Sequence, residues 1–207
     1  MRIDRGVLAM DPDRSTEGDR GSRLRELIHY ILSQYPDRRV STRRLEKLVY
    51  VAELDSIDRF GHRLTDLDFI RDSFGPCSHE LLRVAVGEFE HETFEVEGGE
   101  GRAFMTPDPI EYHHLDDEAV VVLDSVHRDW GARSPDALVD HARSTEPYKD
   151  AAMYSSIDFD KYKACSDALY RNPQLVKELE EASAEVEAGE GTRIGSDEEL
   201  EDYLDSL

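Results

Sequence analysis

The chain has 207 residues, 39% of them hydrophobic, and a formal net charge of -22 at pH 7. The length suits one domain that can bury a core, and no apolar run approaches the roughly 20 residues that a membrane span needs. Two cysteines, Cys77 and Cys165, are too few for a disulfide scaffold and wrongly spaced for a zinc site. Because residues 1–21 are polar and carry charges of both signs, we expect no signal or transit peptide and a cytoplasmic location.

The charge is unusually large and unevenly distributed. Self-repulsion at a net charge of -22 destabilises a compact state in dilute buffer, and arginine outnumbers lysine by 20 to 5. Molar salt shortens the Debye length to about 3 Å and screens this repulsion. We therefore interpret the composition as adaptation to a salt-loving cell; the alternative is an acidic protein from an ordinary cell with a GC-rich genome. Residues 1–50 (11 Lys and Arg, 8 Asp and Glu) carry +3 and residues 51–207 (14 and 39) carry -25, so the acidic surface belongs to the later part.

Helices dominate the predicted structure of the first part of the chain. Residues 1–21 show no apolar period and are expected to be disordered. Apolar side chains at helical spacing predict a first helix over 22–35 and a second over 42–60. Ser41 can cap the second helix at its start, and Gly61 suits a left-handed stop at its end.

Three more helices and one hairpin are predicted next along the chain. Ser78 can cap a helix over 79–89. Alternating apolar residues around several glycines predict a β-hairpin over 94–105. A pair of aspartates opens a helix over 117–130, and a Ser-Pro cap starts a short helix over 135–143.

The last part of the chain is again predicted to be helical. Helices are expected over 159–170 and 173–187, and a glycine-containing linker leads to an amphipathic helix over 196–207. We therefore expect a mainly α fold, with a single helical domain, one small β-hairpin and a C-terminal amphipathic helix. The expected parts of the chain are a disordered segment (1–21), the helical domain (22–172) and an acidic helical extension (173–207).

Motifs for catalysis or metal binding are absent from the sequence. His113 and His114 precede three acids, but adjacent histidines point in different directions in most backbones, and the acids suit the start of a helix. The sequence contains no GxSxG, P-loop, GxGxxG, CxxC or HExxH motif. We therefore predict no catalytic residue, no metal and no cofactor, and a protein that is not an enzyme.

A dense basic cluster, formed by Arg38, Arg39, Arg43 and Arg44, precedes the second predicted helix. Free backbone N–H groups and the helix dipole favour an anion at such a position, so these arginines are candidate anion-binding residues. As the turn of a helix-turn-helix, with the 94–105 hairpin as a wing, the cluster would belong to a DNA-binding transcriptional regulator. The helix that follows is mainly acidic, whereas specific DNA binders concentrate Lys and Arg on the element that enters the groove. DNA binding therefore remains the alternative function. The simplest role for these arginines is a solvent-exposed helix cap whose charges pair with the acidic remainder of the protein.

Three motifs in a fixed order carry a resemblance to a known family. The first is a Leu-x-Lys-Leu-x-Tyr-x-Ala helix, the second an aromatic-Gly-Pro turn, and the third a polar stretch that ends in Pro and an aromatic residue. The motif residues in this chain are Leu45, Lys47, Leu48, Tyr50 and Ala52, then Phe74, Gly75 and Pro76, then His141, Pro147 and Tyr148. Together they resemble the Panacea domain of SocA-like antitoxins over roughly residues 23–165. Tyr148 departs from the family pattern, which usually has Trp.

The resemblance implies a function by binding. Such domains neutralise a cognate protein toxin by direct contact, and an adjacent gene often encodes that toxin. Lys47, Tyr50, Phe74 and Tyr148 are the candidate partner-binding residues, and the polar ends of Lys47 and the two tyrosines lead us to expect them on an exposed surface. The remaining motif residues have the spacing of core or turn positions and are expected to hold the fold: Leu45, Leu48, Ala52, Gly75, Pro76, His141 and Pro147.

Overall fold

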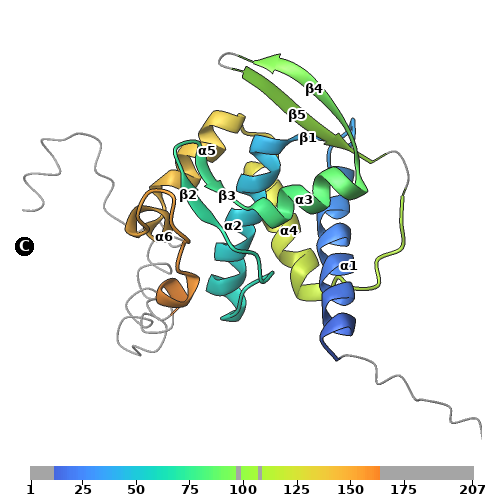
Figure 1. Ribbon diagram of the computed structural model, residues 1–207, viewed down its shortest axis with the longest axis horizontal. Coiled ribbons are helices and arrows are strands. Elements are labelled where there is room, and N and C mark those ends of the chain that lie inside the picture. Colours follow the sequence, from blue (N-terminus) through green and yellow to red (C-terminus); the bar gives the residue numbers. More distant parts are fainter. Residues whose placement is uncertain (1–11, 97–98, 107–108, 164–207) are drawn as a thin grey trace, which may run out of the picture. The chain divides into compact units, whose positions relative to one another are not determined.

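The computed structural model describes residues 12–96, 99–106 and 109–163. The chain divides into a unit of residues 1–163, to which all described residues belong, and a unit of residues 164–207. The predicted acidic helical extension, with its amphipathic helix, lies outside the described residues. The helices and strands of Figure 1 are α1 (Pro12–Ser33), β1 (Arg39–Ser41), α2 (Thr42–Phe60), β2 (Ile70–Asp72), β3 (Gly75–Cys77), α3 (His79–Glu88), β4 (Glu90–Val96), β5 (Gly99–Met105), α4 (Asp117–Trp130), α5 (Pro135–Ser144) and α6 (Glu146–Asp150).

Helix α2 lies at the centre of the fold and packs against α3, α4, α5 and β3. Its ends match the prediction: the Ser41 hydroxyl accepts the N–H of Arg44 at 3.4 Å, and Gly61 closes the helix with a φ of 72°. Most side chains between Leu45 and Ile57 are buried. A helix buried on all sides needs neighbours on all sides, which explains why the other elements surround it (Figure 1).

The starts of α3, α4 and α5 confirm the predicted caps. Ser78, Asp116 and Ser134 each accept the backbone N–H of the third residue after them, at 3.5, 2.8 and 3.2 Å. These bonds satisfy donors that a helix leaves without an internal partner. Helix α1 begins earlier than expected, at Pro12, so residues 12–21 of the segment predicted to be disordered are helical. Helix α6 was not predicted.

The predicted fold class is wrong, because the described residues contain two small sheets and the fold is mixed α/β. The predicted hairpin exists as β4 and β5, and β1 pairs antiparallel with β5, which places Val40 opposite Phe104. A second hairpin, β2–β3, forms a separate two-stranded sheet. Strands β1, β2 and β3 each have 3 residues. This is too short for the alternation that reveals a strand in a sequence.

The order of elements has the connectivity of a winged helix. Helix α1, strand β1, helices α2 and α3 and the β4–β5 hairpin follow one another, and β1 lies beside β5 in the order β1-β5-β4. The β2–β3 hairpin is inserted between α2 and α3. The basic cluster does not form the turn between two helices, as the DNA-binding hypothesis required, because Arg39 lies in β1 and Arg43 and Arg44 in the first turn of α2. Connectivity alone does not fix a function.

Apolar side chains from the helices, from the β1-β5-β4 sheet and from the loops meet in one core. The fully buried members of the core include Leu27, Ile28, Leu45, Phe69, Phe104 and Leu138.

None of the described helices is long and apolar enough to cross a lipid bilayer.

Candidate functional site

A groove of about 820 Å³ opens between the start of α2, the β4–β5 hairpin, the β2–β3 turn and the start of α5. In Figure 1 the β4–β5 hairpin projects beyond the helices, on the side of the N-terminal end of α2. The residues that give the groove its chemistry are Thr42, Arg43, Glu46, Lys47, Phe74, Phe94 and Arg102. Its size is that of a site which takes up a small molecule or a segment of a partner chain.

A buried ion pair forms the floor of the groove. The side chain of Lys47 is 2% exposed, and its Nζ donates to the Glu46 Oε2 at 3.1 Å. Burial raises the pKa of Glu46, and the neighbouring Lys47 ammonium opposes this rise. Removing one partner of such a pair leaves an uncompensated buried charge, so the two residues act as a unit.

Gly75 makes room for the lysine. It has a φ of 100°, and a Cβ at this position would lie 2.8 Å from the Lys47 Cε. Glycine tolerates this backbone conformation and removes the clash, so the turn can cover the lysine stem. The first two family-like motifs therefore meet at the floor of the groove.

Hydrogen bonds of two buried tyrosines connect the third motif to the first two. The Tyr50 hydroxyl lies 2.8 Å from the Thr145 Oγ1, and the Tyr148 hydroxyl donates to the carbonyl oxygen of Asp72 at 2.6 Å. Burial raises the pKa of Tyr50 to about 12. Segments that are far apart in the sequence are thus connected by hydrogen bonds beside the groove.

The prediction that Lys47, Tyr50 and Tyr148 lie on an exposed surface is wrong. They are 2%, 0% and 3% exposed: the Lys47 ammonium pairs with the buried Glu46, and partners inside the protein satisfy the two tyrosine hydroxyls. A buried tyrosine usually finds such a partner for its hydroxyl. Phe74 is the one candidate on the surface, at 71% exposed.

Most residues that were expected to hold the fold lie in the interior. His141 is half-buried and stacks on Trp130 with ring centroids 4.1 Å apart. Burial and the nearby Arg133 lower the pKa of His141. The buried members of this set are Leu45, Leu48, Ala52, Gly75, Pro76 and Pro147.

Two more exposed apolar side chains accompany Phe74 near the β2–β3 sheet. Tyr154 is 70% exposed and Met153 is 47% exposed. The Tyr154 N–H donates to the Arg71 carbonyl oxygen at 2.8 Å, which fixes this segment beside β2. Tyr154 also has a φ of 62°, which is uncommon for a residue other than glycine. Exposed apolar side chains of this size are typical of protein-binding surfaces.

The arginines of the basic cluster point to different places and do not form one anion site. Arg39 forms an ion pair with Glu92 of the hairpin. Arg44 donates to the carbonyl oxygens of Gly131 and Arg133 at 2.8 and 2.6 Å, beyond the end of α4. Arg43 lines the groove and pairs with Asp136 at 3.0 Å. The backbone carbonyl oxygen of Arg38 accepts the Thr106 N–H at 3.3 Å.

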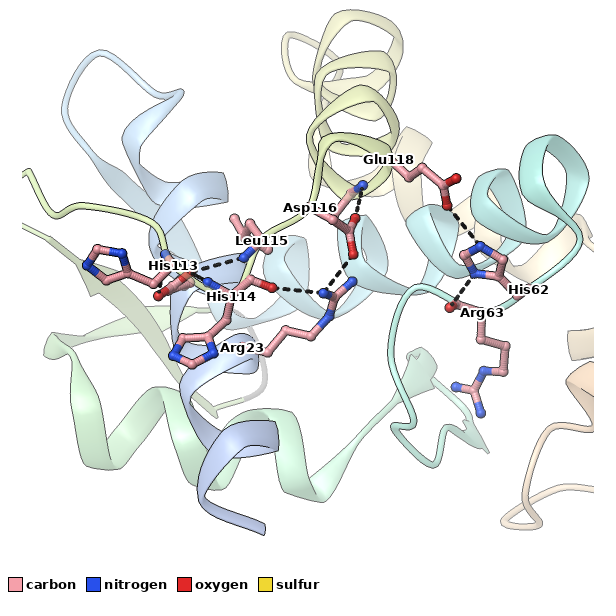
Figure 2. A network of polar contacts seen from close by, with 10 residues as sticks. Arg23, His62, Arg63, His113, His114, Leu115, Asp116 and Glu118 are labelled. Atoms are coloured by element: carbon pink, nitrogen blue, oxygen red, sulfur yellow. Dashed lines mark hydrogen bonds and ion pairs between the residues drawn. The ribbon is translucent and has the colours of Figure 1, made fainter. Parts of the chain in front are cut away.

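A separate polar network joins α1 to the start of α4 (Figure 2). The Glu26 carboxylate accepts the N–H groups of His113, His114 and Leu115 at 2.7 to 3.1 Å. Desolvation opposes ionisation of Glu26, but these three backbone donors outweigh it and lower its pKa. Arg23 donates to the His114 carbonyl oxygen at 2.8 Å and to the Asp116 carboxylate at 2.9 Å. The network fixes the loop before α4.

Figure 2 shows the rings of His113 and His114 pointing to different sides, as expected for neighbouring residues. His62 lies beside α4 instead, with its Nε2 2.9 Å from the Glu118 carboxylate. Across the described ranges, no group of three or more His, Cys, Asp or Glu side chains is placed to hold a metal ion. The hydrogen bonds of Glu26 and Arg23 make this network a structural clamp between α1 and the loop before α4.

No protein-family model, curated protein or solved structure matches this chain. The resemblance to the Panacea domain depends on the motif residues alone. These residues meet beside the groove, which makes the groove the candidate functional site.

Proposed function

We propose that the protein is an antitoxin-like binding protein of the cytoplasm, without enzymatic activity or cofactor, which neutralises a cognate protein toxin by direct contact. The toxin docks in the groove above Lys47. The observation that carries this proposal is the exposure of Phe74, 71%, at the edge of a groove of about 820 Å³. A few aromatic residues supply most of the binding energy in many interfaces, and Phe74 suits this role.

The construction of the groove supports binding over catalysis. Its titratable floor, Glu46 and Lys47, forms an internal ion pair. Around it the three motifs stabilise one another through Tyr50, Tyr148 and Gly75. Such a rigid base reduces the entropy lost when a partner binds.

The charge of the chain restricts the partner. A surface with a net charge of -22 repels nucleic acid and attracts a basic protein at low salt. In molar salt this long-range attraction is screened, so packing and direct pairs hold the complex. We therefore propose a toxin whose surface around the docked segment is basic.

Expression of the adjacent genes tests this proposal. Each neighbour is expressed alone and together with this chain in a salt-adapted host. Growth arrest by one neighbour, relieved by co-expression and accompanied by a complex on gel filtration, is the expected result. Harmless neighbours, with no protein retained in a pull-down at molar salt, would remove the antitoxin proposal.

A winged-helix regulator is the second candidate, and the order of elements favours it. In such a domain α3 would take the position of the recognition helix. Its exposed charged residues are Glu80, Arg83 and Glu88, a net charge of -1, whereas DNA-binding helices are rich in Lys and Arg. A mobility-shift assay with the DNA upstream of the gene decides the matter: a sequence-specific shift at nanomolar protein would reverse the order of the two proposals.

A further inference from the structure

The groove contains cationic donors that the protein itself does not use. The Lys47 ammonium has three N–H groups, and Glu46 is its one acceptor among the described residues. Arg102 lines the groove, and its Nε is buried and has no acceptor in the described part of the chain. A buried donor without an acceptor is costly, so a ligand that brings acceptors into the groove would bind favourably.

The sign of the groove also differs from that of the chain. Its lining includes three cations, Arg43, Lys47 and Arg102, and two carboxylates, Glu46 and Glu100, which gives a net charge of +1. The whole chain has a net charge of -22. The first turn of α2, which also lines the groove, contains no acidic residue, although a helix start favours negative charge. The unused donors, the positive lining and the start of α2 all favour an anionic group at this position.

Apolar side chains lie next to these donors. Phe74, Phe94 and Pro135 line the same groove, and Phe74 is 71% exposed. A free anion would make no contact with these apolar side chains. A peptide segment that carries a carboxylate beside a large apolar side chain would contact both kinds of surface.

We propose that the groove binds an extended segment of the partner in which an Asp or Glu lies directly beside a large apolar residue. The carboxylate accepts hydrogen bonds from Lys47 and Arg102, with Arg43 nearby, and the apolar side chain packs against Phe74. This inference rests on the proposed function, since the segment belongs to the toxin. The toxin is thus basic around the docked segment and acidic at the point that enters the groove.

Matched small probes test the inference without the toxin. The ¹⁵N-labelled full chain is titrated with N-acetyl-Phe-Asp-amide, N-acetyl-Phe-Asn-amide and potassium acetate, in molar KCl. The first two differ only in the carboxylate, and acetate supplies the carboxylate alone. The protein variants are Arg102→Gln, the double variant Glu46→Gln with Lys47→Met, and Arg83→Gln as a control on the exposed face of α3. The double variant removes both charges of the buried pair, so that no lone charge is left inside.

We expect the Asp peptide to bind with roughly millimolar affinity, about tenfold tighter than the Asn peptide and more tightly than acetate. Shift changes should concentrate at Thr42 to Lys47 and Gly99 to Arg102. Arg102→Gln and the double variant should each lose about tenfold in affinity for the Asp peptide, and Arg83→Gln should lose nothing.

The inference is refuted if the Asp and Asn peptides bind equally, or if acetate causes the same shift changes as the Asp peptide. It is also refuted if the shift changes lie outside the groove or do not occur. These outcomes are separable from a failure of the proposed function. If the protein rescues growth but does not prefer the Asp peptide, only this inference is refuted. If it prefers the Asp peptide but neutralises no neighbouring gene product, the antitoxin proposal is refuted and the carboxylate site stands.

Discussion

Gly75 lies against the side chain of Lys47, so close that a Cβ at the glycine would come within 2.8 Å of the lysine Cε. The two residues belong to different motifs, one on a turn and one on the central helix. The contact explains why a glycine stands between the exposed Phe74 and the buried Pro76. It also makes the groove floor sensitive to a single methyl group.

Gly75→Ala should destabilise the protein by about 1–3 kcal/mol, because alanine is strained at positive φ and its Cβ displaces the lysine. The matched control is Gly87→Ala. Gly87 lies in helix α3, with open space around an added Cβ. Alanine there should stabilise the helix by up to about 1 kcal/mol. Urea unfolding of both variants in molar KCl measures the difference, and equal stabilities would refute the packing of Gly75 on Lys47.

Tyr148→Phe should lower the free energy of unfolding by about 1 kcal/mol. The change removes the donor to the Asp72 carbonyl oxygen, which lies 2.6 Å from the Tyr148 hydroxyl. Tyr154→Phe is the control, since Tyr154 is 70% exposed. It should change the melting temperature little. If both variants melt alike, the hydroxyl of Tyr148 does not connect the third motif to the β2–β3 sheet.

Glu26→Gln should destabilise the protein at pH 7 by roughly 1–3 kcal/mol, because a carboxylate that accepts three backbone N–H groups becomes a neutral amide. The pKa of Glu26 is lowered in the folded state. Its contribution to stability is therefore present above the unfolded pKa of about 4.3 and disappears as the pH falls through the lower, folded pKa. The difference between wild type and variant should shrink below about pH 4.

Glu111→Gln provides the control for this pH series, because the Glu111 side chain is 91% exposed and the variant has the same net charge as Glu26→Gln. Urea unfolding between neutral pH and about pH 3.5 gives the profile. A stability gap for Glu26→Gln that stays constant across this range would show that its carboxylate does not act through its charge.

Local signals in the sequence predicted the ends of the helices correctly. Ser41, Ser78 and Gly61 lie within a few residues of the groups that they satisfy, so their roles can be deduced from spacing. The strands of three residues carry no such signal. Their pairing partners lie elsewhere in the chain, as Val40 with Phe104 shows.

The burial of the site residues depended on distant partners and could not be deduced from sequence. The Tyr50 hydroxyl forms a hydrogen bond with the Thr145 hydroxyl, 95 positions away in the sequence. The Tyr148 hydroxyl donates to the Asp72 carbonyl oxygen, 76 positions away. Glu26 was missed for the same reason, because the backbone N–H groups that bind its carboxylate lie 87 to 89 positions away. The one sequence signal that marks it is a carboxylate among apolar helix positions.

Salt should stabilise the fold. The net charge of -22 creates repulsion that is weakened as ionic strength rises. The melting temperature, followed by circular dichroism, should increase from about 0.1 M to above about 1 M KCl. A nonionic osmolyte at matched osmolality separates charge screening from general stabilisation. A melting temperature that is flat or falls with KCl would contradict adaptation to a salt-loving cell.

Phe74→Ala should weaken toxin binding by at least about tenfold, or about 1.4 kcal/mol, if Phe74 is the aromatic anchor of the interface. The melting temperature should be unchanged, because the side chain is 71% exposed and supports little of the core. Val121→Ala is the matched control: Val121 is 49% exposed on α4, and its loss should alter neither affinity nor melting. Calorimetric titration with the toxin identified by co-expression gives the affinities. If Phe74→Ala binds as tightly as wild type while Val121→Ala binds more weakly, the toxin docks on α4 and the groove is not its site.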